Sequence, residues 1–162
     1  MQVWRSEEDE VCTVFVGPDR HVVSANSLGV VGTNGWYCSQ ADVDKFPALS
    51  GWRGLLDPAV QRYFNRTFMG FQPDWGPDTL IMQTLGLGYD VVYLGDEAET
   101  IIEQRLAASI PTFFYLWSPH PLVAKYPVSR IPLPEYTDTA SFDAGKSDYP
   151  PGEMLEKVAS GP

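Results

Sequence analysis

The sequence predicts an α/β protein, a three-layer αβα sandwich in which a mostly parallel sheet lies between helices. Three observations carry this prediction. Between residues 58 and 131, segments of strand composition alternate with segments of helical periodicity. The strand segments are short apolar runs bounded by turn residues, as expected for buried strands. The length of 162 residues is sufficient for one compact core.

The expected strands share an aliphatic or aromatic composition and end in turn residues. They cover residues 11–16, 21–24, 28–31, 67–70, 89–94, 111–117 and 127–133. The sequence Gly17-Pro18-Asp19 favours a hairpin between the first two. The third is expected to end at the glycines of residues 32–35. The strand over residues 111–117 must end near Trp117, because Pro119 and Pro121 cannot occupy a central strand.

The expected helices begin at residues that can cap them. They cover residues 39–46, 57–65, 78–87 and 97–109. Ser39 is a favourable N-cap, and Asp57 followed by Pro58 combines a capping side chain with the proline preferred at the first helical position. The helix over residues 97–109 carries acidic residues in its first turn, where they compensate the helix dipole. We expect residues 1–136 to form one α/β lobe and the polar, proline-rich residues 137–162 to form a tail.

Charge and composition exclude several classes of function. The formal charge is −10, with 21 acidic against 11 basic residues, so a nucleic-acid partner is not expected. No segment approaches the roughly 20 apolar residues of a membrane span, and the first residues lack the apolar region of a signal peptide. The sequence contains neither a Gly-x-Ser-x-Gly elbow nor a phosphate-binding loop, so no enzyme activity is predicted.

No cofactor or metal site is expected, because no Cys and His spacing is typical of zinc ligands. The two cysteines, Cys12 and Cys38, leave two outcomes open. They pair if the fold brings their Cα atoms within about 7 Å, and otherwise they remain buried thiols. The second outcome is the one we expect.

Three blocks of sequence occur in the order found in a known family. They cover residues 28–64, with GTNGWYCSQ and the Asp-Pro helix start; residues 68–77, with QPDWGP; and residues 110–133, with WSPH and AKY. A weaker block covers residues 148–160. Together they resemble the substrate-binding proteins of glycine betaine/proline betaine ABC transporters, over about 140 residues. The resemblance implies one lobe, mainly the second, of a type II periplasmic-binding-protein fold, and the tail is then expected to return toward a first lobe.

The resemblance also implies a ligand site. Trp75 and Trp117 would supply two rings of an aromatic cage for a quaternary ammonium group, which aromatic faces attract. Gly76 and His120 would contribute donors for a ligand carboxylate, although His120 is equally open to be a helix N-terminal residue that packs beside Pro119 and Pro121. Pro77 stands where the family often has Cys, and it lacks the amide N–H that a carboxylate would use.

Further aromatic residues have packing as their expected role. Tyr115 and Tyr126 either line the pocket or pack in the core, and Trp4, Trp36 and Trp52 are interpreted as packing residues. The predicted function is a solute-binding lobe for glycine betaine, proline betaine, choline or a similar compound. Its partner would be an ABC transporter permease or a first binding lobe, and its location extracytoplasmic.

Two other hypotheses remain open. The lobe is alternatively a ligand-sensing or interaction module of a larger receptor, diverged and not binding betaine, and Pro77 agrees with divergence. Self-association of two copies is also open, because rim aromatics left uncovered favour contact between proteins.

Overall fold

The computed structural model describes residues 2–3 and 22–160, with side chains for residues 27–155. The chain divides into two compact units, residues 1–33 with 151–162 (unit 1) and residues 34–150 (unit 2). Cys12 and most of the expected hairpin lie outside the described residues.

Unit 1 consists of paired antiparallel strands. β7 (Glu153–Ser160) pairs with β1 (Gln2–Val3) and with the first part of β2 (Val22–Ser39). The register of β2 against β7 shifts twice, between Ser24 and Ser27 and between Ser27 and Val31.

The prediction that a strand ends at the glycines of residues 32–35 is wrong, because β2 continues through them to Ser39. Gly32 is opposite Glu153 of β7, and Trp36 is opposite Ile131 of β6. The ladder partners therefore change along β2, from β7 to β6.

The sheet of unit 2 is mostly parallel, as predicted. Its strands are the end of β2, β3 (Thr67–Gly70), β4 (Asp90–Tyr93), β5 (Phe113–Ser118) and β6 (Val128–Ile131). The order is β2-β5-β3-β4, with β6 antiparallel to β2. β3 is parallel to both of its neighbours, β4 and β5. The carboxyl ends of these three strands therefore share one edge of the sheet.

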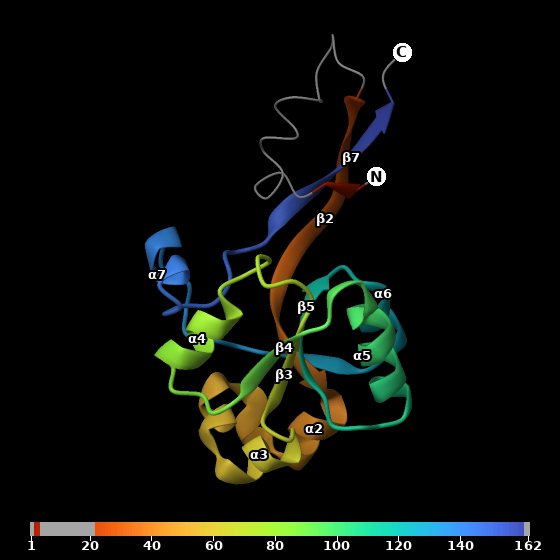
Figure 1. Ribbon diagram of the computed structural model, residues 1–162. Coiled ribbons are helices and arrows are strands. Elements are labelled where there is room, and N and C mark those ends of the chain that lie inside the picture. The colour runs from red at the N-terminus through yellow and green to blue at the C-terminus, as the bar shows by residue number, and fades with distance from the viewer. Residues whose placement is uncertain (1, 4–21, 161–162) are drawn as a thin grey trace. The chain divides into compact units, whose positions relative to one another are not determined.

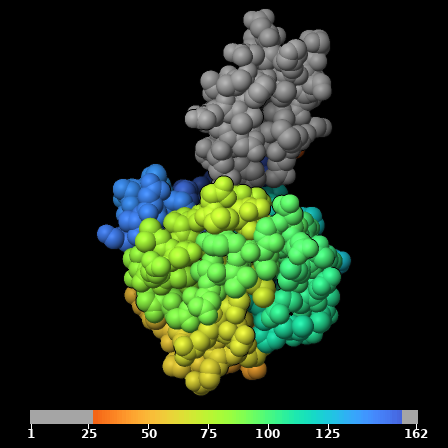
Figure 2. Space-filling view, in the orientation of Figure 1, coloured from red at the N-terminus to blue at the C-terminus, as the bar shows by residue number. Residues whose placement is uncertain are grey.

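Short helices connect the strands of unit 2. They are α2 (Gln40–Lys45), α3 (Pro58–Tyr63), α4 (Asp78–Thr84), α5 (Ala98–Ala107), α6 (Pro121–Lys125) and α7 (Thr139–Asp143). Both predicted caps are present: the Ser39 hydroxyl accepts from the Asp42 amide, and the Asp57 carboxylate accepts from the Ala59 amide. Figure 1 shows α4 on one side of strands β3–β5 and α5 with α6 on the other, which is the layered arrangement that the alternation predicts. On the face seen in Figure 2, the yellow-green surface around α4 continues into the blue-green surface around α5.

Unit 2 extends beyond residue 136, where we expected the tail to begin. It reaches Pro150, and it includes α7 and the buried residues Ser147, Asp148 and Tyr149. Residues 137–150 are mostly polar, but they include two aromatic rings, Tyr149, which is buried, and Phe142, which is partly buried against it. Within the described ranges, no helix has the length and apolar character needed to span a bilayer.

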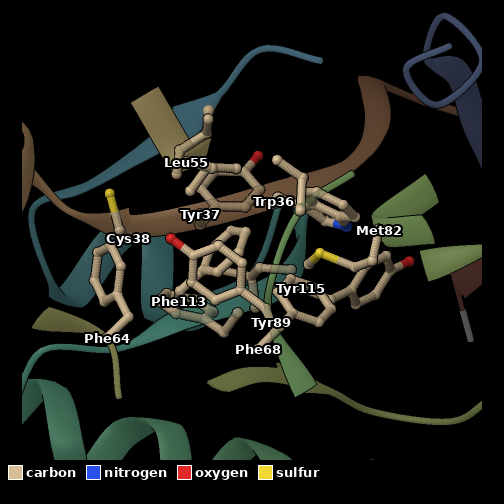
Figure 3. Close-up of a cluster of buried hydrophobic side chains, with 14 of the residues drawn as sticks. Trp36, Tyr37, Cys38, Leu55, Phe64, Phe68, Met82, Tyr89, Phe113 and Tyr115 are labelled. Atoms are coloured by element: carbon tan, nitrogen blue, oxygen red, sulfur yellow. The ribbon is translucent and has the colours of Figure 1, made fainter. Parts of the chain in front are cut away.

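The core of unit 2 is rich in aromatic side chains (Figure 3). Trp36 is fully buried and packs against Phe68 and Phe113, with ring centroids 5.0 and 5.5 Å away. Cys38 is a free, buried thiol, and burial raises its pKa to about 12. These contacts join β2 to β3 and β5, and so fix the strands whose ends carry the candidate site.

Candidate functional site

Four aromatic side chains gather at the edge where β3 and β5 end. Tyr115 and Trp117 belong to β5, while Phe71 and Trp75 follow β3 in the loop to α4. Parallel neighbouring strands bring these segments together, as expected at the ligand-binding edge of an open α/β sheet. We call these four residues the aromatic rim.

The rings of the aromatic rim are in mutual contact. The indoles of Trp75 and Trp117 have centroids 5.6 Å apart and an interplanar angle of 74°. Phe71 stacks on Trp75 at 5.6 Å and 13°, and it meets Trp117 edge-on at 5.1 Å. Tyr115 lies 6.4 Å from Trp75 and 6.3 Å from Trp117. The two tryptophans, 42 positions apart in the sequence, thus form adjacent walls at an open angle.

Exposure divides the aromatic rim into two outer and two inner rings. Trp75 is 47% exposed and Trp117 is half-buried, whereas Phe71 and Tyr115 are buried behind them. A group of contacting aromatic rings that is partly exposed is more informative than a single exposed apolar side chain, because such patches often mark binding sites. The outer rings are therefore available to a cation, and the inner rings support them.

Gly76 has a packing role in the structure. A Cβ atom at this position would lie 2.9 Å from Cε1 of Tyr149, so only glycine allows the Tyr149 ring to lie against the turn. The Tyr149 hydroxyl donates to Asp78 Oδ1, and the Trp36 indole N–H donates to the same oxygen at 2.6 Å. Asp78 is 2% exposed, and burial raises the pKa of its carboxyl while these two hydrogen bonds oppose the rise.

His120 caps a helix beside the aromatic rim. Its Nδ1 accepts a hydrogen bond from the Leu122 amide at the start of α6, which places the proton of the neutral ring on Nε2. Nε2 lies 4.0 Å from the Glu99 carboxylate, and the imidazole meets Trp117 edge-on at 4.4 Å. Burial lowers the pKa of His120, with Glu99 acting in the opposite direction. His120 is thus a helix N-terminal residue, as one of the two alternatives expected, and its contact with a ligand stays a prediction.

The structure brings together all four predicted site residues. Trp75 and Trp117 form the outer walls of the rim. The other two have packing contacts, Gly76 with the Tyr149 ring and His120 with the Trp117 ring. Sequence reasoning missed Phe71 and Tyr149. Phe71 ends the apolar run of β3 and resembles an ordinary core residue, and Tyr149 lies within a polar stretch.

The remaining predicted packing residues agree with the structure where they are described. Trp36 is a core residue, and Trp52 is half-buried with the Arg53 guanidinium 4.7 Å from its ring centre. The side chain of Trp4 lies outside the described residues. In the part of the chain that the structure describes, no group of three or more His, Cys, Asp or Glu residues could hold a metal ion.

A family described as the substrate binding domain of ABC-type glycine betaine transport system matches residues 2–154. Curated protein sequences yield no match. Among solved structures, the chain is similar to the glycine betaine, L-proline ABC transporter binding protein ProX from Borrelia burgdorferi. That superposition has a TM-score of 0.58 at 13% identity, and covers 98% of this chain and 54% of the other.

Two further structures share the fold. An ABC-transporter choline binding protein in complex with choline has a TM-score of 0.54 at 14% identity, and the match covers 96% of this chain and 50% of that chain. Lactococcal OpuAC in its closed form with glycine betaine has a TM-score of 0.50 at 11% identity, with 99% of this chain and 56% of that chain covered. The chain therefore spans about half the length of each of these type II periplasmic binding proteins.

Proposed function

The chain belongs to the family of substrate-binding domains of ABC-type glycine betaine transport systems, and we propose that its aromatic rim binds a quaternary ammonium compound. The family is one of transport proteins and not of enzymes. One observation carries the proposal: two indoles from separate strand ends meet at 5.6 Å and 74° at the edge of the sheet, and Trp75 is 47% exposed.

The chemistry of the aromatic rim suits a methylated cation. A trimethylammonium group has no N–H to donate, so it is recognised through the negative faces of aromatic rings. Two walls at an open angle can contact such a group from two directions, and the inner rings Phe71 and Tyr115 keep those walls in place. The net charge of −10 further favours a cationic ligand over an anionic one.

Trimethylammonium ligands that also carry a carboxylate, such as glycine betaine, need donors beyond the two rings. Pro77 offers no amide N–H at the turn, whereas the cap of α6 uses only Nδ1 of His120 and leaves its Nε2–H, 4.0 Å from the Glu99 carboxylate, as a donor. We therefore propose choline or glycine betaine as candidates, with the ammonium group as the part that this lobe recognises. By the same family membership we propose that the protein acts outside the cytoplasm and delivers its ligand to an ABC transporter permease.

The affinity of this chain alone should be low. Each good cation–π contact is worth roughly 0.5–2 kcal/mol, so two rings give a dissociation constant in the millimolar range or weaker. Micromolar binding of betaine or choline by this chain in calorimetry would contradict the expectation that a second lobe supplies the rest of the site.

The test is a titration that separates charge from shape. Choline, glycine betaine and the uncharged choline isostere 3,3-dimethyl-1-butanol are added to ¹⁵N-labelled protein while the indole N–H signals of Trp75 and Trp117 are followed. Choline should shift both signals, with a much smaller response to the isostere. Equal responses to choline and its isostere would mean that the rim is only an apolar surface, and no response to any of the three would remove the proposal.

A further inference from the structure

One guanidinium in unit 2 contacts both ends of the unit. Arg130 of β6 donates two hydrogen bonds to the carboxylate of Asp148, from Nη1 at 2.9 Å and from Nη2 at 2.7 Å. Its Nε and Nη2 also donate to the backbone carbonyl of Asn34, at 3.3 and 3.0 Å. Asn34 is the first residue of unit 2, and Pro150, its last, follows Asp148 by two positions.

The surroundings of Arg130 indicate a built arrangement and not a chance surface pair. The paired forks of guanidinium and carboxylate give the strong, geometrically defined form of ion pair. The Asp148 carboxylate is nearly buried and also accepts from the backbone amides of Leu133 and Tyr149. Gly35 leaves the space that the guanidinium occupies, because a Cβ atom there would lie 2.3 Å from Arg130 Nε.

Each partner of Arg130 is linked directly to a tyrosine, Asn34 to Tyr115 of the rim and Asp148 to Tyr149 next to it. Asn34 Oδ1 accepts a hydrogen bond of 2.9 Å from the Tyr115 hydroxyl, and Tyr115 is one of the inner rings. The residue after Asp148 is Tyr149, whose ring centroid is 5.7 Å from that of Tyr115. Two separate routes thus lead from Arg130 to the inner side of the rim.

Tyr149 connects the second route to Trp75. Its ring fills the space beneath Gly76, the residue directly after Trp75, and its hydroxyl is bound to Asp78 at the start of α4. A shift of Tyr149 would therefore move the turn that carries the exposed indole.

From this geometry we propose that Arg130 is a positioning residue for the aromatic rim. It holds Asn34 and Asp148 in place and thereby sets Tyr115 and Tyr149, which support the outer rings. This inference rests on the proposed function in one respect, the assumption that the rim binds a ligand.

The test compares Arg130→Lys with Arg62→Lys by nuclear magnetic resonance, first without ligand. Lysine keeps the charge but cannot form the paired contacts. Arg62 is exposed on α3 and belongs to none of these contacts, so its variant is the matched control. In Arg130→Lys the indole N–H signals of Trp75 and Trp117 should move while the amides of α3 stay in place. In Arg62→Lys both indole signals should be unchanged.

Unmoved indole signals in a folded Arg130→Lys variant would overturn the inference, because the rim would then be independent of Arg130. If that variant does not fold, Asp148→Asn provides the second test, since asparagine keeps an acceptor for the Tyr149 amide but loses the ion pair. Movement of the Trp75 and Trp117 signals in Asp148→Asn supports the inference, and its absence overturns it.

A titration with tetramethylammonium chloride then gives the functional consequence. Its affinity for Arg130→Lys should fall roughly 3- to 10-fold relative to wild type, in line with the usual size of such couplings. A wild-type protein that does not respond to tetramethylammonium would count against the proposed function, whereas the ligand-free comparison still decides the role of Arg130.

Discussion

Trp36 and Trp75 are the same residue type in opposite environments. Trp36 is fully buried, and its N–H donates to Asp78 while its ring packs on two phenylalanines. Trp75 is 47% exposed and contacts only other members of the rim among the aromatic residues described. The comparison teaches that this chain separates its stable core around Trp36 from the exposed aromatic rim that we propose to bind the ligand.

The largest expected difference is in stability. Trp36→Ala should lower the free energy of unfolding by about 3–5 kcal/mol, because it opens a cavity among β2, β3 and β5. Trp75→Ala should cost only about 1–2 kcal/mol, through lost ring contacts and partial burial. Urea unfolding of both variants measures this. Equal losses would show that Trp75 is as much a structural residue as Trp36.

The second prediction concerns Asp78, which joins the two regions. Asp78→Ala should lower the free energy of unfolding by about 2–4 kcal/mol, because two buried donors, from Trp36 and Tyr149, lose their acceptor. Asp78→Asn keeps an acceptor oxygen without the buried charge and should cost much less at pH 7. Thermal unfolding of the two variants separates the hydrogen bonds from the charge.

Asp78 should also give a recognisable pH dependence. Burial raises its pKa in the folded protein, so the folded state holds this proton more tightly than the unfolded state does. The contribution of Asp78 to stability is therefore complete below the ordinary Asp range, about pH 4, and is lost as pH rises through the raised pKa. Asp78→Asn should lack this decline, and an identical pH profile would contradict the assignment.

Much of the fold could be predicted because its signals are local. The strand over residues 67–70 and the helix start at Asp57 and Pro58 agree with the structure to the residue. The glycines of residues 32–35 led to the wrong prediction that a strand ends there, because the sequence alone does not distinguish a glycine within a strand from one in a turn. Only the partner strands β6 and β7, far away in the sequence, show that β2 continues.

The candidate site could be predicted in its outer part, while Tyr115 of the inner part was left open between a pocket and a core role. Two tryptophans at strand ends are visible in the sequence, and the order of the strands brings them together. The inner support was not visible, because Tyr149 acts from within a polar segment and Arg130 acts through residues 96 and 18 positions away. Contacts of that kind depend on tertiary geometry that no local pattern encodes.

The third prediction addresses recognition. Trp75→Ala and Trp117→Ala should each weaken binding of choline by about 2- to 30-fold, corresponding to roughly 0.5–2 kcal/mol for one cation–π contact. Trp52→Ala is the matched control, since this half-buried indole packs with Arg53 and takes no part in the rim. Choline titrations of the three variants by nuclear magnetic resonance measure the effect. A loss as large in Trp52→Ala would indicate a general structural disturbance.

The smallest expected effect separates the two interpretations of His120. Burial lowers the pKa of this group in the folded protein, so the unfolded state binds the proton more readily. Its contribution to stability is complete above about pH 6.5 and is lost as pH falls through the lowered pKa.

Two variants of His120 test this. His120→Asn preserves a capping acceptor for the Leu122 amide and should flatten the pH profile of stability between pH 7.5 and 5. His120→Ala should lower the free energy of unfolding by about 0.5–2 kcal/mol at pH 8 through loss of the cap. His21→Asn gives the contribution of the other histidine. If His120→Ala leaves stability unchanged at pH 8 but weakens binding of glycine betaine more than that of choline, capping is not the main role of His120, and contact with a ligand carboxylate becomes the better explanation.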